Sequence, residues 1–155
     1  MTADRATRLS DFADGPRRLD EALAEIPRSA WRIRAEGSDW TVHQILVHLV
    51  DSEAHGYLRF RHAIAEPGTA VNAWDQDVWP RALDYHHEDA DDAIALFTLL
   101  RRRTVALFSH LAPDDWSRTI LHPENGAMSV DDLLITYADH VDAHIAQIRA
   151  VASAT

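Results

Sequence analysis

The stretch Trp40-Thr-Val-His-Gln-Ile-Leu-Val-His-Leu-Val-Asp-Ser-Glu53 contains the best-marked helix start of the chain. Thr41 and Gln44 stand three positions apart in a capping-box pattern, in which each side chain accepts a hydrogen bond from the backbone N–H of the other residue. Apolar residues then recur at helical spacing until the turn signal Pro67-Gly68. The stretch therefore predicts a helix over residues 41–65.

Outward from this segment, three more regions have apolar residues at helical spacing and recognisable ends. They cover residues 9–26, 88–111 and 129–151. Gly15-Pro16 predicts a late start or a kink in the first region, since proline disrupts a helix interior. Ser129 and Asp132 form a second capping pattern, which predicts the start of the last helix.

The connections complete the expected architecture. Residues 66–87 are too many for a tight turn and include Trp74, Trp79 and Tyr85, so we expect this crossover to pack over one end of the bundle. Asn125-Gly126, between the third and fourth helices, is a strong tight-turn signal that allows a short hairpin. The sequence predicts an all-α fold, a four-helix bundle with a long crossover between the second and third helices.

Length and composition exclude several classes of protein. A chain of 155 residues is predicted to form a single domain, residues 1–155, and has no apolar run long enough to span a membrane. No signal-peptide pattern is present, so a cytoplasmic location is expected. The net charge of −10 disfavours nucleic acid and membrane surfaces as partners. Since the chain has no cysteine, any metal site must use histidine and carboxylate ligands.

Histidines provide the candidate site. His140 and His144 stand one helical turn apart, at the edge of an apolar stripe, where two imidazoles can reach one ion. No glutamate follows the first histidine, so the general base of a metalloprotease helix is missing. His48 lies on a polar stripe of the second helix with His55 and Arg59. The spacing alone fits either a metal site or solvated histidines.

Four blocks of the sequence resemble the DinB-like superfamily, especially its YfiT-like branch of metal-dependent hydrolases. The blocks are Trp40–Glu53, Tyr57–Arg61, His122–Gly126 and Tyr137–Ile145. The resemblance spans residues 9–150 and implies a four-helix bundle, typically a homodimer, that binds zinc or nickel. It implies the metal ligands His48, His140 and His144. The chain departs from the branch at Asp139, Ala143 and Gln147, where an aromatic residue or histidine is common.

Three neighbouring residues are candidates for further roles. Asp51, one turn beyond His48, is a candidate catalytic residue that orients a ligand or accepts a proton, or else an exposed aspartate. Arg59 is a candidate for binding an anionic substrate group, with an ion pair to an acidic neighbour as the alternative. His122 is a candidate substrate-binding residue at the mouth of the bundle, with a plain turn histidine as the alternative.

Several functions fit these residues. The resemblance implies a hydrolase that acts on a small molecule with metal-activated water. A thiol S-transferase using mycothiol, bacillithiol or glutathione requires the same three histidines. A bundle that binds metal or ligand without catalysis is the third alternative. The sequence does not separate them.

Overall fold

The computed structural model describes residues 3–154 of the chain. Its four long helices are α1 (Ala3–Ala24), α2 (Val42–Ala65), α4 (Ala90–Phe108) and α5 (Val130–Ser153). The shorter elements are the α-helix α3 (Trp79–Ala82), the 3-10 helices η1 (Arg28–Ala30), η2 (Tyr85–His87) and η3 (Pro113–Ser117), and the strands β1 (Thr119–His122) and β2 (Gly126–Ser129). The predicted all-α four-helix bundle is confirmed.

Both predicted capping boxes are present. Thr41 Oγ1 accepts a hydrogen bond from the Gln44 backbone N–H at 3.2 Å, and Gln44 Oε1 accepts one from the Thr41 N–H at 3.1 Å. Ser129 and Asp132 make the same reciprocal pair at 3.1 and 2.9 Å. Each box satisfies N–H groups that have no partner inside the helix. These caps fix the starts of α2 and α5, the two helices that carry the candidate ligands.

Helix α1 differs from the prediction because it begins at Ala3 and continues through Pro16. Proline has no N–H to donate, so the carbonyl of Phe12, four residues earlier, loses its helical partner. Arg101 Nη1 of α4 donates a hydrogen bond to this carbonyl at 3.0 Å. A tertiary contact thus replaces the helical bond that Pro16 removes.

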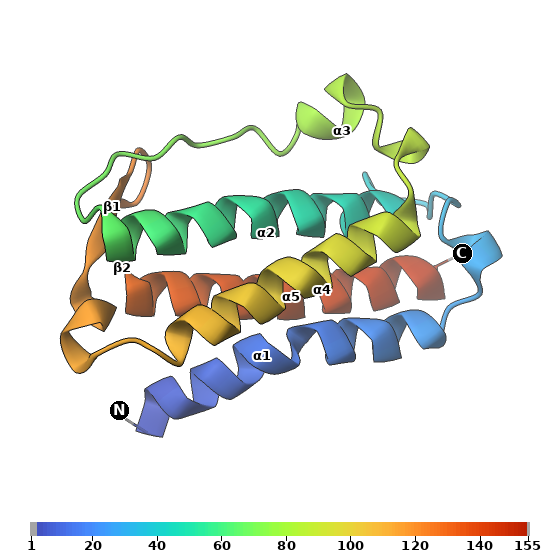
Figure 1. Cartoon of the computed structure of the whole chain (residues 1–155). Coiled ribbons are helices and arrows are strands. Elements are labelled where there is room, and N and C mark those ends of the chain that lie inside the picture. The colour runs from blue at the N-terminus through green and yellow to red at the C-terminus, as the bar shows by residue number, and fades with distance from the viewer. Residues whose placement is uncertain (1–2, 155) are drawn as a thin grey trace.

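The crossover also differs from the prediction. Figure 1 shows α2 and α4 running in the same direction, opposite to α1 and α5, so the chain between α2 and α4 must return along the length of α2. At one end, Val71 N–H donates to the Leu121 carbonyl at 3.0 Å. At the other, His43 Nε2 lies 3.0 Å from the Tyr85 carbonyl. The crossover therefore covers one side of the bundle and not one end.

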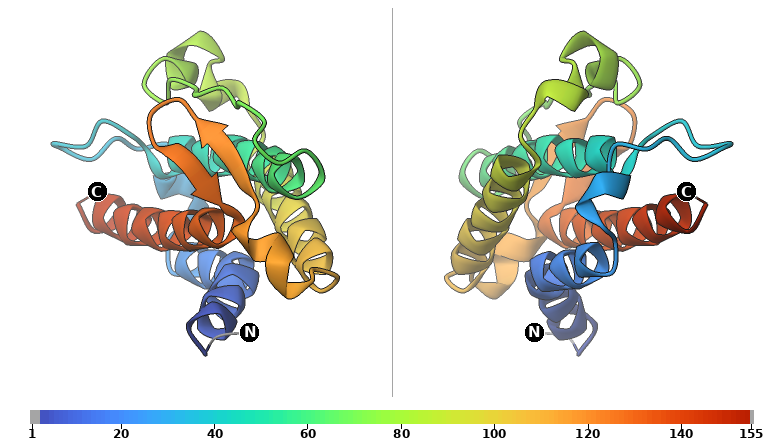
Figure 2. Two further views of the ribbon diagram at one scale, coloured as in Figure 1. Left: turned by 90° about the vertical axis from the view of Figure 1, so that its left-hand side faces the viewer. Right: turned by 90° about the vertical axis from the view of Figure 1, so that its right-hand side faces the viewer.

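The predicted hairpin is present as an antiparallel pair of β1 and β2, with His122 opposite Gly126. Gly126 has φ +71°, a left-handed conformation that glycine adopts without a steric penalty. Figure 2 shows the hairpin crossing one end of the bundle. No helix within residues 3–154 has the length and apolar character needed to cross a membrane.

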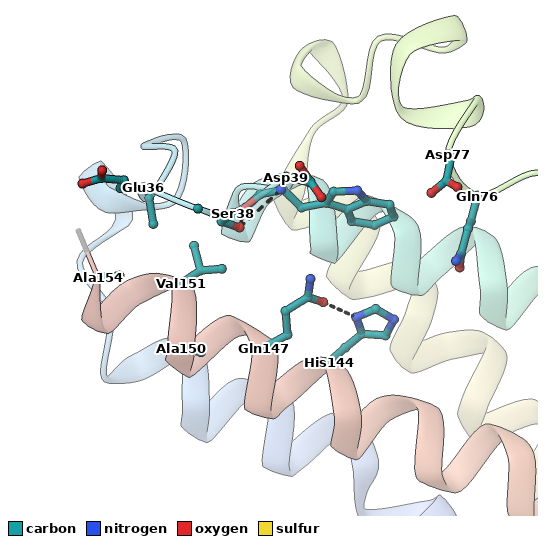
Figure 3. Close-up of a pocket in the computed structure, with 13 residues that line it drawn as sticks. Glu36, Ser38, Asp39, Gln76, Asp77, His144, Gln147, Ala150, Val151 and Ala154 are labelled. Atoms are coloured by element: carbon teal, nitrogen blue, oxygen red, sulfur yellow. Dashed lines mark hydrogen bonds between the residues drawn. The ribbon is translucent and has the colours of Figure 1, made fainter.

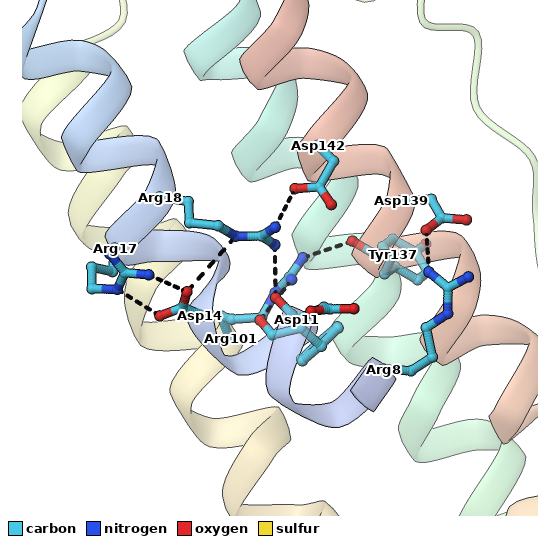
Figure 4. Close-up of polar contacts among 10 residues, drawn as sticks. Arg8, Asp11, Asp14, Arg17, Arg18, Arg101, Tyr137, Asp139 and Asp142 are labelled. Atoms are coloured by element: carbon cyan, nitrogen blue, oxygen red, sulfur yellow. Dashed lines mark hydrogen bonds and ion pairs between the residues drawn. The ribbon is translucent and has the colours of Figure 1, made fainter. Parts of the chain in front are cut away.

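The core has two apolar clusters with a buried ion pair at their boundary. Arg101 is 1% exposed, and its Nε donates to Glu53 Oε1 at 2.9 Å. Its Nη2 donates to the Tyr137 carbonyl at 3.1 Å, a contact visible in Figure 4. The guanidinium also lies over the ring of Phe12 in one cluster and that of Phe97 in the other. Arg101 therefore ties all four long helices together.

Candidate metal centre

Helices α2 and α5 bring three imidazoles together in the interior of the bundle. His140 and His144 project from consecutive turns of α5, and His48 faces them from α2. His140 Nε2 lies 3.2 Å from His48 Nε2 and 3.1 Å from His144 Nε2. One ligand atom from each ring lies within 4.8 Å of both others. The Nε2 atoms thus point toward a common centre.

Burial keeps these rings neutral. Desolvation, with a smaller contribution from the neighbouring histidines, lowers the pKa of His48 to about 3. Desolvation, followed by His144 and Arg101, likewise lowers the pKa of His140 to about 3. Burial also lowers the pKa of His144. Metal ligation requires neutral imidazole, so the rings are in the protonation state that a divalent ion needs.

The spacing of the nitrogens fits a shared ion. Two nitrogens bound tetrahedrally at about 2.0–2.1 Å lie about 3.3 Å apart. Two at right angles around the same ion lie roughly 2.9 Å apart. The observed distances of 3.1 and 3.2 Å fall between these values. The residues present therefore fit a divalent metal held by three imidazoles, with coordination positions left for water or substrate.

Two tryptophans enclose His48, a feature that the sequence analysis missed. The Trp40 ring lies edge-on at 4.8 Å from the His48 ring, and Trp74 of the crossover lies at 5.3 Å. Trp74 also stacks on His55, with ring centroids 5.1 Å apart. The position of Trp74 depends on the path of the crossover, for which the sequence offers no local signal.

A pocket of about 520 Å³ opens beside His144 (Figure 3). Its wall includes Trp40, the α5 side chain of Gln147 and the three carboxylates of Glu36, Asp39 and Asp77. No Lys or Arg side chain of the described residues lines it. Gln147 Oε1 lies 2.8 Å from His144 Nδ1. The pocket gives a ligand a route to the edge of the histidine cluster.

Asp51 contacts the crossover instead of a candidate ligand. Its carboxylate accepts a hydrogen bond from the Tyr85 hydroxyl at 2.5 Å, and burial raises the pKa of Asp51. His48 Nδ1 is buried, and within residues 3–154 it has no hydrogen-bond partner. The structure therefore does not join Asp51 to the His48 ring, although the two residues lie one turn apart on α2.

Arg59 and His122 lie near each other, and neither lines the pocket beside His144. Arg59 Nη1 donates to the Tyr137 hydroxyl at 2.9 Å, and Nη2 donates to the Asn72 carbonyl at 3.2 Å. His122 is 8% exposed, and burial followed by the charge of Arg59 lowers its pKa. The guanidinium of Arg59 thus joins α2 to α5 and to the crossover, and within residues 3–154 it forms no ion pair with an acidic neighbour.

Known proteins that are similar in sequence to this chain share one descriptive name. The family model described as the DinB superfamily matches residues 11–148. A protein of Oceanobacillus iheyensis named "putative metal-dependent hydrolase" is 29% identical over 143 residues, which cover 92% of this chain and 83% of that protein. A protein of Bacillus licheniformis with the same descriptive name is also 29% identical, over 92% of this chain and 81% of its own length.

Solved structures share the fold. YfiT from Bacillus subtilis, whose four-helix bundle has an unusual topology, superposes with a TM-score of 0.89 at 24% identity, covering 99% of this chain and 89% of YfiT. A mycothiol-dependent maleylpyruvate isomerase superposes with a TM-score of 0.75 at 14% identity, covering 96% of this chain and 63% of the isomerase. Because the family model spans most of the chain and the bundle matches, this protein belongs to the DinB superfamily.

Proposed function

We propose that this protein is a metal-dependent hydrolase of a small molecule, with a divalent metal ion held by the Nε2 atoms of His48, His140 and His144. The observation that carries the proposal is the convergence of the three neutral rings, with His140 Nε2 at 3.1 Å from His144 Nε2 and at 3.2 Å from His48 Nε2. Zinc and nickel both suit imidazole ligands. Such an ion, with open positions, lowers the pKa of water toward about 7 and polarises an oxygen of the substrate.

The residues around the histidine cluster have different roles in binding the substrate. Trp40 and Trp74 pack on His48 and exclude water from that side. The pocket beside His144 is where the substrate binds in this proposal, because it opens on the edge of the cluster. Its wall carries Glu36, Asp39 and Asp77, for which no ion pair occurs within residues 3–154. Negative potential in a cleft favours uncharged or cationic substrates over anionic ones.

The proposal gives different roles to Arg59, His122 and Asp51. Arg59 and His122 are assigned to substrate binding only if the substrate extends toward Tyr137 and the crossover, where both side chains lie. Asp51 acts through the crossover, because its carboxylate holds Tyr85. A proton-accepting role for Asp51 requires the crossover to move.

Thiol transfer is the second candidate, because the fold is shared with an isomerase that depends on mycothiol. The same three histidines serve both candidates. A test must therefore follow the fate of the nucleophile, which is water in one reaction and a thiol in the other.

The deciding experiment is an assay of the zinc-loaded and nickel-loaded protein, with and without added thiol. The substrates are nitrophenyl esters and nitroanilides whose acyl groups are neutral, cationic or anionic. We expect hydrolysis of neutral or cationic substrates that is lost in His144→Ala and kept in His62→Ala, which removes an exposed histidine of α2. Turnover only with thiol would favour the transferase. Equal rates for the metal-loaded wild type, the metal-free protein and a variant without the three histidines would overturn both enzymatic proposals.

A further inference from the structure

The side chain of Gln147 contacts the His144 imidazole from the next turn of α5. Gln147 Oε1 and His144 Nδ1 are 2.8 Å apart, and both side chains line the pocket (Figure 3). The contact involves the nitrogen of His144 that faces away from the cluster, since Nε2 lies 3.1 Å from His140 Nε2. Gln147 is thus placed to act on His144 without contacting the proposed ion.

The chemistry of the two groups fixes the direction of this hydrogen bond. A neutral imidazole carries one N–H and one lone pair. If the lone pair of Nε2 is directed to the centre of the cluster, the proton must be on Nδ1, and Gln147 must present its carbonyl oxygen to it. The NH₂ group of Gln147 then points away from His144. Figure 3 shows it directed into the pocket, where water can satisfy its N–H groups.

The His48 ring is held differently. His48 Nδ1 is buried without a hydrogen-bond partner in the described part of the chain, and the packing of Trp40 and Trp74 restricts this ring instead. His144 lies at the pocket wall and is less enclosed. A ring at an open wall needs a specific partner to hold one tautomer and one orientation.

We propose that Gln147 is a positioning residue, which holds His144 as the Nδ1–H tautomer with its Nε2 lone pair directed at the cluster. This inference rests on the proposed function only in assuming that the three histidines are ligands. It predicts that the amide of Gln147 strengthens metal binding through His144, although it never touches the ion.

The first measurement uses the metal-free protein at pH 8. Long-range ¹⁵N–¹H NMR of the imidazoles should find His144 as the Nδ1–H tautomer. In Gln147→Met, which keeps the length of the side chain and removes the acceptor, the spectrum should change toward a mixture or the Nε2–H form. A wild-type Nε2–H tautomer, or an unchanged spectrum in Gln147→Met, would overturn the proposal whether or not metal binds.

The second measurement is zinc affinity by competition with a chromophoric chelator. Loss of such a partner typically costs about 10–100-fold in metal affinity, and we expect this loss in Gln147→Met. Gln147→Glu keeps an acceptor at the same position and should restore wild-type affinity or better. Gln76→Met makes the same change at another wall of the pocket and should have no effect.

The two measurements separate the possible failures. Equal affinities for wild type and Gln147→Met would overturn the positioning role. Absence of zinc binding by the wild type, together with the expected tautomer, would overturn the proposed function and leave Gln147 as the group that orients His144. Circular dichroism of each variant checks that the bundle is intact.

Discussion

The protonation of His48 and His140 is set mainly by burial, because no carboxylate contacts either ring among the described residues. Each ring has a pKa of about 3 in the fold, against about 6.5 for an unperturbed histidine. The folded state therefore favours neutral rings. In the metal-free protein, the unfolded chain takes up protons below about pH 6.5 that the folded chain does not.

This difference predicts how stability depends on pH. The contribution of the neutral rings is fully present above about pH 6.5 and is lost as the pH falls toward 3, on the order of 3 kcal/mol for each ring by pH 4. Urea unfolding of the metal-free protein from pH 8 to pH 4 measures it. The variant His140→Gln should have a flatter profile, since it lacks one titrating ring. Equal unfolding midpoints at pH 7 and pH 5 for the wild type would contradict the prediction.

Arg101 supports a second prediction at this scale. Its guanidinium neutralises Glu53 and also binds the Phe12 carbonyl that Pro16 leaves without a partner. Arg101→Met leaves a buried carboxylate and a buried carbonyl unpaired, so we expect a loss of about 3–5 kcal/mol. Glu53→Gln combined with Arg101→Met should recover part of this loss. A loss below about 1 kcal/mol in chemical denaturation of the single variant would contradict this role.

Among the helices, α2 passes close to the Tyr137 ring of α5 at Gly56. A Cβ atom on Gly56 would lie 2.6 Å from Tyr137 Cε1, too close for an unstrained contact. The α2–α5 interface also carries His48, His140 and His144. The absence of a side chain at Gly56 therefore lets the two helices that carry the candidate ligands pack closely.

Gly56→Ala tests this packing. At an open helix position the change stabilises by about 1 kcal/mol, whereas here we expect a loss of about 1–3 kcal/mol from overpacking. The loss should shrink when Tyr137→Leu is added, in a double-variant cycle followed by urea unfolding. A gain in stability for the single variant would mean that α2 and α5 are further apart than described.

Local signals in the sequence predict the helices better than their connections. The caps at Thr41 and Ser129 depend only on residues three positions apart, so the starts of α2 and α5 follow from the sequence. Pro16 stays within α1 because Arg101, from a helix far along the chain, satisfies the carbonyl of Phe12. The crossover path depends on α2 and α4 being parallel, which no local pattern encodes.

The candidate site also has features that the sequence predicts and features that it does not. The spacing of His140 and His144 places both on one face of α5, and the resemblance adds His48 from α2. Trp74 reaches the site only because the crossover lies along α2. The spacing on α2 places Asp51 one turn from His48, but its carboxylate accepts a hydrogen bond from the Tyr85 hydroxyl of the crossover. Residue spacing in the sequence predicts which side chains share one face of a helix, but it does not predict their contacts with the crossover.

For the whole molecule, assembly is still a prediction. The resemblance to the superfamily implies a homodimer, and a two-fold arrangement is the simplest one. Sedimentation equilibrium at tens of micromolar protein should give twice the chain mass of 17.5 kDa. A mass equal to one chain under these conditions would contradict the prediction. The same run on His144→Ala separates assembly from metal binding, because this side chain lies in the pocket wall.

The arrangement of the bundle brings the three candidate metal ligands together. Packing of α2 against α5 brings His48 to His140 and His144, which lie far along the chain from it. The crossover covers one side, and a pocket opens at His144. Every functional proposal above depends on these three side chains holding one ion.

The most direct test is the metal content of the purified protein after exposure to zinc or nickel and removal of excess ion, measured by inductively coupled plasma mass spectrometry. We expect one ion per chain in the wild type and in the controls His43→Ala and His62→Ala, whose rings contact Tyr85 and Glu66. His48→Ala, His140→Ala and His144→Ala should each lose most of it. Full metal content in the variant that lacks all three histidines, or no binding by the wild type, would contradict the account.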